Sequence, residues 1–517
     1  SPTKNGSIPP TATRVAGSDK LKQTTASTAS PRPPVIRRGA VTLSLALMSN
    51  DNAVARVTAA LTAVIEAGSP GDKLPSVREL MARYRVSPTT VQTAVQHLAA
   101  RGLVDVRPGR GTFIAVPPAP ESSAPPDLSW QSVVLGDARA GEEELAALLA
   151  THHPEAIPLS SGYFDQQLQP HGALGAAMAR AARKPAAWTR QPTEGLPELR
   201  EWFAHDIGGG LRAADMTICS GGQPALAAAF RGLGRPGDVV LVEAPTYLGA
   251  IAAARDAGLR VVGVPADEHG VRPDLLASAF RCTGARLFYC QPLHANPHGA
   301  VLSAERRAAV LDTVAKAHAF LIEDDYARGL TLDGVAPAPL AVDDPDGHVV
   351  YVRSLTKVVA PGMRLSVIGA RGVAAARLRT ARLLDDLFVA GPLQHTAVEF
   401  LTSPSWPRHL RALRAGLRQR RDALVQALRT HVPWLHVPRP SGGMHLWVRL
   451  PDGSDEQAVT AKAMARELVV FPGRPWFPAE PTGQYLRLSF GALTAELAAA
   501  AASRLAEALR AAGSGPT

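Results

Sequence analysis

Five short apolar runs, each followed by polar residues, constrain the fold of this chain more than any other feature. Runs of four or five apolar residues with polar boundaries are typical of buried strands, and the segments between them are long enough to form helices. From about Ile157 onward, this pattern predicts an α/β domain with a mostly parallel sheet. The runs are Met216–Cys219, Val239–Val242, Arg286–Cys290, Ala319–Ile322 and Val349–Val352.

The last run leads into Ser354-Leu355-Thr356-Lys357 and then to Arg364. Lys357 is expected just past the carboxyl end of its strand, where open α/β sheets bind ligands. A lysine amine there can form a Schiff base with an aldehyde, while Arg364 and the hydroxyls of Ser354 and Thr356 can grip a phosphate. Pyridoxal phosphate carries both groups. The motif alone leaves open that Lys357 is a surface lysine beside a turn.

Other strand ends carry polar groups that suit the same ligand. Gly222-Gln223 opens a helix whose free backbone amides can hold an anion. Tyr247 offers a stacking face, Asn296 an amide in a tight turn, and the residues after Ile322 offer carboxylates. A metal is the weaker interpretation, since no histidine or oxygen-rich cluster lies nearby in sequence, and the three cysteines form no CxxC pair.

Positive charge is concentrated at the front of the chain. Residues 1–116 contain fifteen Lys and Arg against six Asp and Glu, a balance of +9 out of the total of +10. This asymmetry favours a nucleic-acid partner over a membrane. A solubilising tail is the alternative, because seven of these basic residues precede Gly39.

Residues 1–38 are rich in Ser, Thr, Pro and Ala and are predicted to be disordered. After them, apolar spacing predicts a helix over 52–67. Ser76 and Glu79 have capping-box spacing at the start of a second helix, and Ser87-Pro88 opens a third. Two strand-like stretches around a Pro-Gly-Arg-Gly turn follow, which completes a winged helix-turn-helix over 39–116.

In such a unit, the exposed face of the third helix enters the major groove and the wing meets phosphate or the minor groove. A small protein-binding module with a basic surface is the alternative. The residues expected to contact DNA are Arg78, Ser87, Thr89, Thr90, Gln92, Thr93 and Gln96 on the helices, with Arg107 and Arg110 on the wing.

The run LPSVRELMARYRVSPTTVQTAVQHLAARGLVDVRPGRGTFIA resembles the DNA-binding domain of GntR-type bacterial regulators over its whole length. Its LPSxREL start and GxGTF wing carry the resemblance. Pro88 stands where that family usually has a basic residue after the serine, so one expected DNA contact changes.

A proline-rich stretch separates this domain from the rest of the chain. It contains five prolines between Pro117 and Leu128, and residues 117–140 are predicted to be a semi-rigid linker. A helical run over 142–150 follows. The large domain is predicted over 141–517.

Residues from about 155 to 510 resemble class I and II aminotransferases of fold type I. With the first domain, the chain resembles a MocR-type regulator. The resemblance implies a winged helix-turn-helix of α+β type, then a three-layer α/β/α fold with a smaller C-terminal α+β subdomain, pyridoxal 5′-phosphate as cofactor, and a homodimer that can exchange its DNA-binding domains.

The resemblance also implies site roles. Lys357 forms the internal aldimine, and Asp324 pairs with the pyridine nitrogen. Arg487, in Tyr485-Leu486-Arg487-Leu488-Ser489-Phe490-Gly491, holds an amino acid's carboxylate. Tyr247 stacks on the ring, Asn296 and Tyr326 hydrogen-bond the phenolic oxygen, and the phosphate is held by Gly222, Gln223, Ser354 and Arg364.

Two departures from the family pattern stand out. The NPTG turn reads Asn296-Pro297-His298-Gly299, and the tyrosine that often reaches the neighbouring subunit's cofactor is absent. Trp188 or Arg190 can take its place.

The favoured hypothesis is a cytoplasmic bacterial regulator that binds a double-stranded DNA operator and senses pyridoxal phosphate, or an amine or amino acid that forms an external aldimine with it. No apolar run of about eighteen residues suggests a membrane segment. The alternative is a working aminotransferase with an accessory DNA-binding domain. A third reading makes the large domain a dimerisation scaffold.

Overall fold

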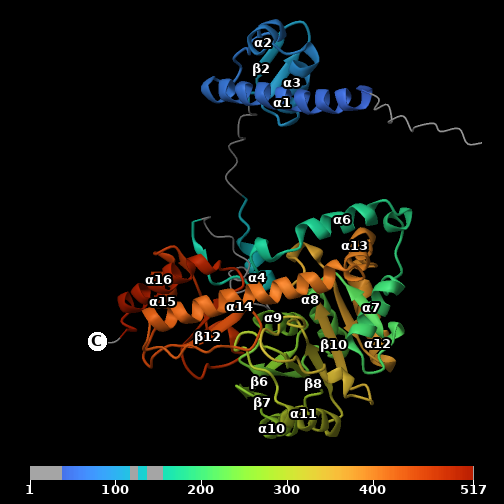
Figure 1. Ribbon diagram of the computed structural model, residues 1–517, viewed down its shortest axis with the longest axis vertical. Coiled ribbons are helices and arrows are strands. Elements are labelled where there is room, and N and C mark those ends of the chain that lie inside the picture. Colours follow the sequence, from blue (N-terminus) through green and yellow to red (C-terminus); the bar gives the residue numbers. More distant parts are fainter. Residues whose placement is uncertain (1–37, 117–125, 137–154, 516–517) are drawn as a thin grey trace, which may run out of the picture. The chain divides into compact units, whose positions relative to one another are not determined.

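The computed structural model describes residues 38–116, 126–136 and 155–515, with side chains described from residue 53 onward. The chain divides into two compact units between Leu128 and Ser129 (Figure 1). The disorder predicted for residues 1–38 lies outside the described residues except at Arg38, which is helical, and the helix predicted over 142–150 lies outside them entirely.

The first unit is a winged helix-turn-helix. Helices α1 (Arg38–Ala67), α2 (Val77–Tyr84) and α3 (Pro88–Ala100) precede an antiparallel hairpin of β1 (Val104–Arg107) and β2 (Gly111–Ile114). Its hydrophobic core draws on all of these elements and consists of Val57, Leu61, Leu74, Leu80, Val91, Ala94, Val95, Leu98, Val104 and Ile114.

The predicted starts of α2 and α3 both have the expected N-terminal caps. Ser76 Oγ accepts from the Glu79 amide at 3.3 Å, and Glu79 Oε2 accepts from the Ser76 amide at 2.7 Å, so the capping box is complete. Ser87 Oγ accepts from the Thr90 amide at 3.2 Å, with Pro88 in the first turn.

Helix α1 begins at Arg38, earlier than the predicted start at residue 52. The stretch from Gly39 to Asn50 is rich in Ala, Leu and Met, which favour helix, and contains no proline that would stop one. The prediction was therefore too short, because it relied on the clearer apolar spacing after residue 52.

The second unit is built on an eight-stranded sheet (Figure 1). Adjacent strands are parallel from β10 through β6, while β11 runs antiparallel to both of its neighbours. The strand order is β4 (Met216–Cys219), β11 (Ser366–Gly369), β10 (Val349–Ser354), β9 (Phe320–Asp324), β8 (Leu287–Cys290), β5 (Val239–Ala244), β6 (Arg260–Asp267) and β7 (Gly270–Val271). The mostly parallel sheet predicted from the apolar runs is confirmed.

Both faces of this sheet are buried, which is why its strands read as continuous apolar runs. In β10, Val349 and Tyr351 enter one core cluster, whereas Val350 and Val352 enter the other. Helices α7 (Pro197–Ile207), α10 (Pro273–Thr283) and α11 (Ala304–Lys316) pack on the first face, and α8 (Gly222–Leu233), α9 (Leu248–Asp256) and α12 (Gly372–Asp386) on the second. The result is the expected three-layer α/β/α arrangement.

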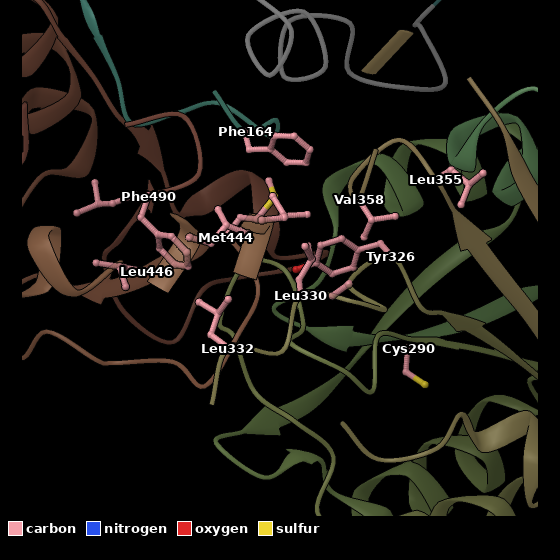
Figure 2. Packing of buried hydrophobic residues seen from close by; sticks show 14 of the residues in the cluster. Phe164, Cys290, Tyr326, Leu330, Leu332, Leu355, Val358, Met444, Leu446 and Phe490 are labelled. Carbon is pink, nitrogen blue, oxygen red and sulfur yellow. The ribbon is translucent and has the colours of Figure 1, made fainter. Parts of the chain in front are cut away.

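A smaller α+β part completes the second unit. Its three-stranded antiparallel sheet has the order β12 (His445–Arg449), β15 (Tyr485–Ser489) and β14 (Phe471–Pro472), beside α14 (Ser405–His431), α15 (Glu456–Met464) and α16 (Ala498–Ala511). Figure 2 shows Leu446 and Phe490 from this part in the same buried cluster as Cys290 of β8 and Tyr326, which follows β9.

The remaining elements are short or peripheral. Helix α4 (Ser129–Leu135) lies inside the stretch predicted to be a linker, with its side chains exposed. Helices α6 (His171–Ala182) and α13 (Gly391–Leu401) pack against each other, and β3 (Ile157–Pro158) pairs with β13 (Leu468–Val469). Among the described residues, no helix is both long and apolar enough to cross a bilayer.

Candidate functional site

One cavity in the second unit collects every residue predicted to bind a cofactor or a carboxylate. The strand ends of the large sheet supply most of them, and β15 supplies Arg487. The residues of the prediction that line the cavity are Gly222, Gln223, Tyr247, Asn296, Asp324, Tyr326, Ser354, Lys357, Arg364 and Arg487. Residues as far apart in sequence as Gly162 and Arg487 thus line a single pocket.

Lys357 follows β10 by three residues, and its amine is held inside the cavity. Its Nζ donates to the Gly162 carbonyl at 2.8 Å and lies 3.9 Å from the centre of the Tyr163 ring. Burial, together with the nearby positive charges of Arg487 and Arg364, lowers the pKa of the Lys357 amine to about 7. Near neutral pH, a large fraction of this amine is therefore uncharged and nucleophilic.

Asp324 is held by two donors that sequence reasoning missed. Its Oδ2 accepts from the Tyr289 hydroxyl and from Gln291 Nε2, both at 2.8 Å. Gln291 Oε1 also accepts from the Asn296 amide at 2.9 Å, so one side chain fixes two predicted site residues. Burial raises the pKa of the Asp324 carboxyl to about 6, against the opposing effect of these hydrogen bonds.

A cradle for an anion lies where α8 begins. Gly221 has φ 122°, and a Cβ placed there would lie 2.4 Å from Arg364 Nη2, so the guanidinium reaches this turn only because glycine has no side chain. A Cβ on Gly222 would lie 3.5 Å from Ser354 Cβ. Backbone amides, Arg364 and the Ser354 hydroxyl thus surround one space at a helix start, which suits a phosphate.

Two predicted ligand contacts are engaged with protein groups instead. Gln223 Nε2 donates to the Gly249 carbonyl at 2.7 Å, and Gln223 Oε1 accepts from the Tyr247 hydroxyl at 3.2 Å. The Tyr326 hydroxyl donates to the His294 carbonyl at 2.6 Å. Burial raises the pKa of both tyrosines, so both stay protonated.

Arg487 is a buried cation without a carboxylate partner among the described residues. Its Nη2 donates to the Ser160 carbonyl, and its Nη1 lies 3.5 Å from Asn296 Oδ1. The guanidinium lies 4.4 Å from the Trp476 ring centre, and Nε has no partner. Burial lowers the pKa of this group to about 9, which leaves it charged at neutral pH. Burying an uncompensated charge is costly, so the position suits an incoming carboxylate.

His445 lines the same cavity and was not predicted. On adjacent strands His445 is opposite Ser489 and Trp447 is opposite Arg487, which puts the histidine and the arginine on one face of the small sheet. His445 is buried, its Nδ1 has no partner, and burial lowers its pKa well below the usual value. A neutral imidazole therefore lies near the Arg487 guanidinium and the Lys357 amine. Only its position after Gly442-Gly443, at the start of a strand, could have drawn attention to it.

The two departures from the family pattern differ in setting. Trp188 is 68% exposed, and its Nε1 donates to the Ala182 carbonyl at 2.9 Å, so the large ring is fixed on the surface. Arg190 is exposed nearby in sequence. His298, by contrast, is half-buried with its Nε2 inside the protein, and burial lowers its pKa to about 4.

The first unit presents a second candidate site on α3 and the wing. Thr89, Gln92 and Gln96 are exposed, and Thr93 is half-buried. Thr90 was predicted to face DNA, but the structure shows that this is wrong. Its side chain is 2% exposed, and its Oγ1 lies 2.8 Å from Ser87 Oγ, because its position on the helix turns it toward the core.

The basic residues expected at DNA are all exposed. Arg78, Arg107 and Arg110 lie at the surface, and the Arg107 guanidinium stacks 4.6 Å from the centre of the Phe113 ring. Lys73, which was not predicted, lies 6.0 Å from the same ring.

Comparisons with known proteins agree with this architecture. The family model for aminotransferase class I and II matches residues 154–505. The chain belongs to the class I and II aminotransferase family. The model for bacterial regulatory proteins of the gntR family matches residues 53–114. The chain therefore combines the two modules expected of a MocR-type regulator.

Individual relatives include both transcriptional regulators and aminotransferases. The HTH-type transcriptional regulator YdfD of Bacillus subtilis is 27% identical over 81% of this chain and 88% of its own length. The 2-aminoadipate transaminase of Thermus thermophilus is 31% identical over 74% of this chain and 98% of its own. A crystal structure of Thermus thermophilus LysN with N-(5′-phosphopyridoxyl)-L-leucine has a TM-score of 0.67 and 29% identity, covering 74% of this chain and 99% of that one.

Proposed function

We propose that this protein is a DNA-binding transcriptional regulator whose aminotransferase-like unit holds pyridoxal 5′-phosphate at Lys357 and senses the cofactor, or an amine or amino acid that reacts with it. The observation that carries the proposal is the coexistence, in one chain, of a winged helix-turn-helix with exposed cationic side chains and a cavity whose lysine has its pKa lowered to about 7.

The side chains around the cavity fit this cofactor. Lys357 supplies a neutral amine, Asp324 an acid for the ring nitrogen, and the turn at Gly221 with Arg364 a cradle for a phosphate. When bound, the cofactor supplies an aldehyde carbon and an electron-withdrawing ring. The crystal structure of the relative LysN holds a phosphopyridoxyl amino acid, which supports the same assignment.

Arg487 gives the proposed sensor its preference for a carboxylate. The guanidinium is buried and unpaired by any carboxylate in the described part of the chain, so a bound amino acid would supply the missing counter-charge. An effector would act by stabilising one arrangement of the regulator over another, which changes its affinity for DNA. Since the proposed target is bacterial DNA, we place its action in the cytoplasm.

We also propose a homodimer, in which a second copy covers Trp188. A large aromatic side chain that is 68% exposed and fixed by a hydrogen bond is typical of an interface residue. Sedimentation of wild-type and Trp188→Ala protein tests this. A monomer at all concentrations for the wild type would contradict it.

The decisive experiment tests cofactor binding by the second unit and DNA binding by the first in the same protein. Wild-type protein incubated with pyridoxal phosphate should develop a visible absorbance band that Lys357→Ala lacks, and it should bind the DNA upstream of its own gene with an affinity that changes with cofactor or amine. The matched variant Lys316→Ala, an exposed lysine on α11, should behave as wild type. If the protein binds no DNA under any condition, the proposed function as a regulator is wrong.

A working aminotransferase is the second candidate, because Lys357, Asp324 and Arg487 all line the cavity. Sustained conversion of an amino acid and a keto acid by purified protein, lost in Lys357→Ala, would favour it. A regulator without turnover predicts no more than one equivalent of product per site.

A further inference from the structure

The exposed face of α3 carries amides and hydroxyls but no cation. The helix, Pro88–Ala100, contains no lysine or arginine. Thr89, Gln92, Thr93 and Gln96 recur at helical spacing and form one stripe, since residues three and four apart share a face. The stripe runs over the eight residues from Thr89 to Gln96, whose seven helical rises span about 10 Å, and this matches about three base pairs of DNA.

The one titratable side chain of α3, His97, borders the stripe on the side of α1, four residues after Thr93. His97, together with Arg101 just beyond the helix, lines a shallow groove against Ala55, Thr58 and Ala59 of α1. His97 therefore lies at the edge of the stripe that faces α1.

The hydrogen-bonding groups of the stripe match one class of base pair. A glutamine amide offers one donor and one acceptor, which suits adenine N6 and N7 in the major groove, whereas guanine offers two acceptors and pairs best with arginine or lysine. The Thr93 hydroxyl already donates to the Thr89 carbonyl at 2.9 Å, so its methyl group remains for contact with a thymine methyl.

The cations of this unit are elsewhere. Arg107 stacks 4.6 Å from the Phe113 ring centre on the wing, and Lys73 approaches the same ring from the turn before α2. A Cβ on Gly111 would lie 2.8 Å from Lys73 Cε, so the wing glycine permits this approach. Affinity for phosphate and reading of bases are thus separated in the unit.

We propose that α3 reads adenine–thymine base pairs in the major groove through Gln92 and Gln96, while the cations of the wing supply salt-dependent affinity for the DNA backbone. This inference rests on the proposed DNA-binding function and adds the chemical class of the sequence that is read.

Selection from randomised DNA duplexes with the full-length protein tests the inference. Enriched sites should carry A·T pairs at two neighbouring major-groove positions. Gln92→Ala and Gln96→Ala should each lower discrimination at one position by roughly 5- to 150-fold. His97→Ala, the matched control on the α1 side, should leave the preference unchanged.

Arg107→Ala should behave differently. It should weaken binding to all sequences alike and reduce the slope of log affinity against log salt by about 0.9. Enriched G·C pairs at the read positions, or a preference unchanged in both glutamine variants, would overturn the inference. Failure to enrich any DNA would overturn the DNA-binding function and this inference with it.

Discussion

Burial sets the chemistry of the individual residues in the cavity. Lys357, Asp324 and Arg487 each lose favourable hydration, so the pKa of each shifts in the direction that favours the neutral form. The shift matters most for the Lys357 amine, because its pKa falls to about 7, within the physiological range. A lysine in water would be almost fully protonated there.

This shift predicts the pH dependence of cofactor attachment. Covalent attachment of pyridoxal phosphate to cofactor-free protein should speed up as pH rises to about 7 and then level off, because only the neutral amine attacks and its folded-state pKa is lowered to about 7. Stopped-flow absorbance over a pH series measures it. Lys357→Ala should show only slow, non-saturating reaction, and a rate that still rises at pH 10 would contradict the lowered pKa.

His445 allows a separate test of the carboxylate end of the cavity. His445→Phe should retain the cofactor band, because the predicted cofactor contacts are untouched, but lose about 1 kcal/mol of affinity for an amino acid, or about fivefold, since one hydrogen-bonding group is removed. Titrating the absorbance change with amino acids measures this. His445→Gln should recover part of the loss, and equal affinities in all three proteins would show that the imidazole makes no contact.

At the scale of elements, the capping box at α2 contributes to the stability of the first unit. Ser76→Ala removes the acceptor for the Glu79 amide and should destabilise the helix by about 1 kcal/mol. Hydrogen–deuterium exchange of the full-length protein should then be about fivefold faster across α2 and α3, and unchanged across the large sheet. Glu79→Gln, which keeps a capping side chain, should show a smaller effect.

Strands and their ends could be predicted from the sequence because both faces of the sheet are buried. Continuous apolar runs such as Val349–Val352 have clear boundaries, and the carboxyl ends of parallel strands must meet at one edge. Positions such as Lys357 and Asp324 follow directly from that rule.

Other parts depend on tertiary contacts that leave no local pattern. Gln291 matters because it bridges Asp324 and Asn296, and Gly162 matters because its carbonyl accepts from Lys357. Thr90 looked like its exposed neighbours on α3 until the packing against Ser87 was known. The helix at 129–135 was missed because proline-rich composition just before it dominated the interpretation.

For the whole molecule, the decisive property is that each unit has its own core. The first unit's core uses residues from Val57 to Ile114, while the clusters of the second use residues from Ile157 onward. All seven tryptophans, the first of which is Trp130, belong to the second unit. Tryptophan fluorescence therefore reports on the second unit alone.

Two separate unfolding transitions are expected from this division. Pyridoxal phosphate should raise only the transition seen by tryptophan fluorescence, because a ligand stabilises the unit that binds it. Operator DNA should raise only the other transition, which appears in circular dichroism but not in tryptophan fluorescence. A single transition by both probes, raised equally by both ligands, would show that the units unfold together.

The self-contained core of the winged helix also bears on how such a protein can be rebuilt. Since none of the described residues of that core is borrowed from the second unit, the DNA reader can be exchanged for that of a relative by joining the chains near Leu128. With the proposed sensing function, such a hybrid would respond to the same small molecule but bind the promoter that the relative recognises.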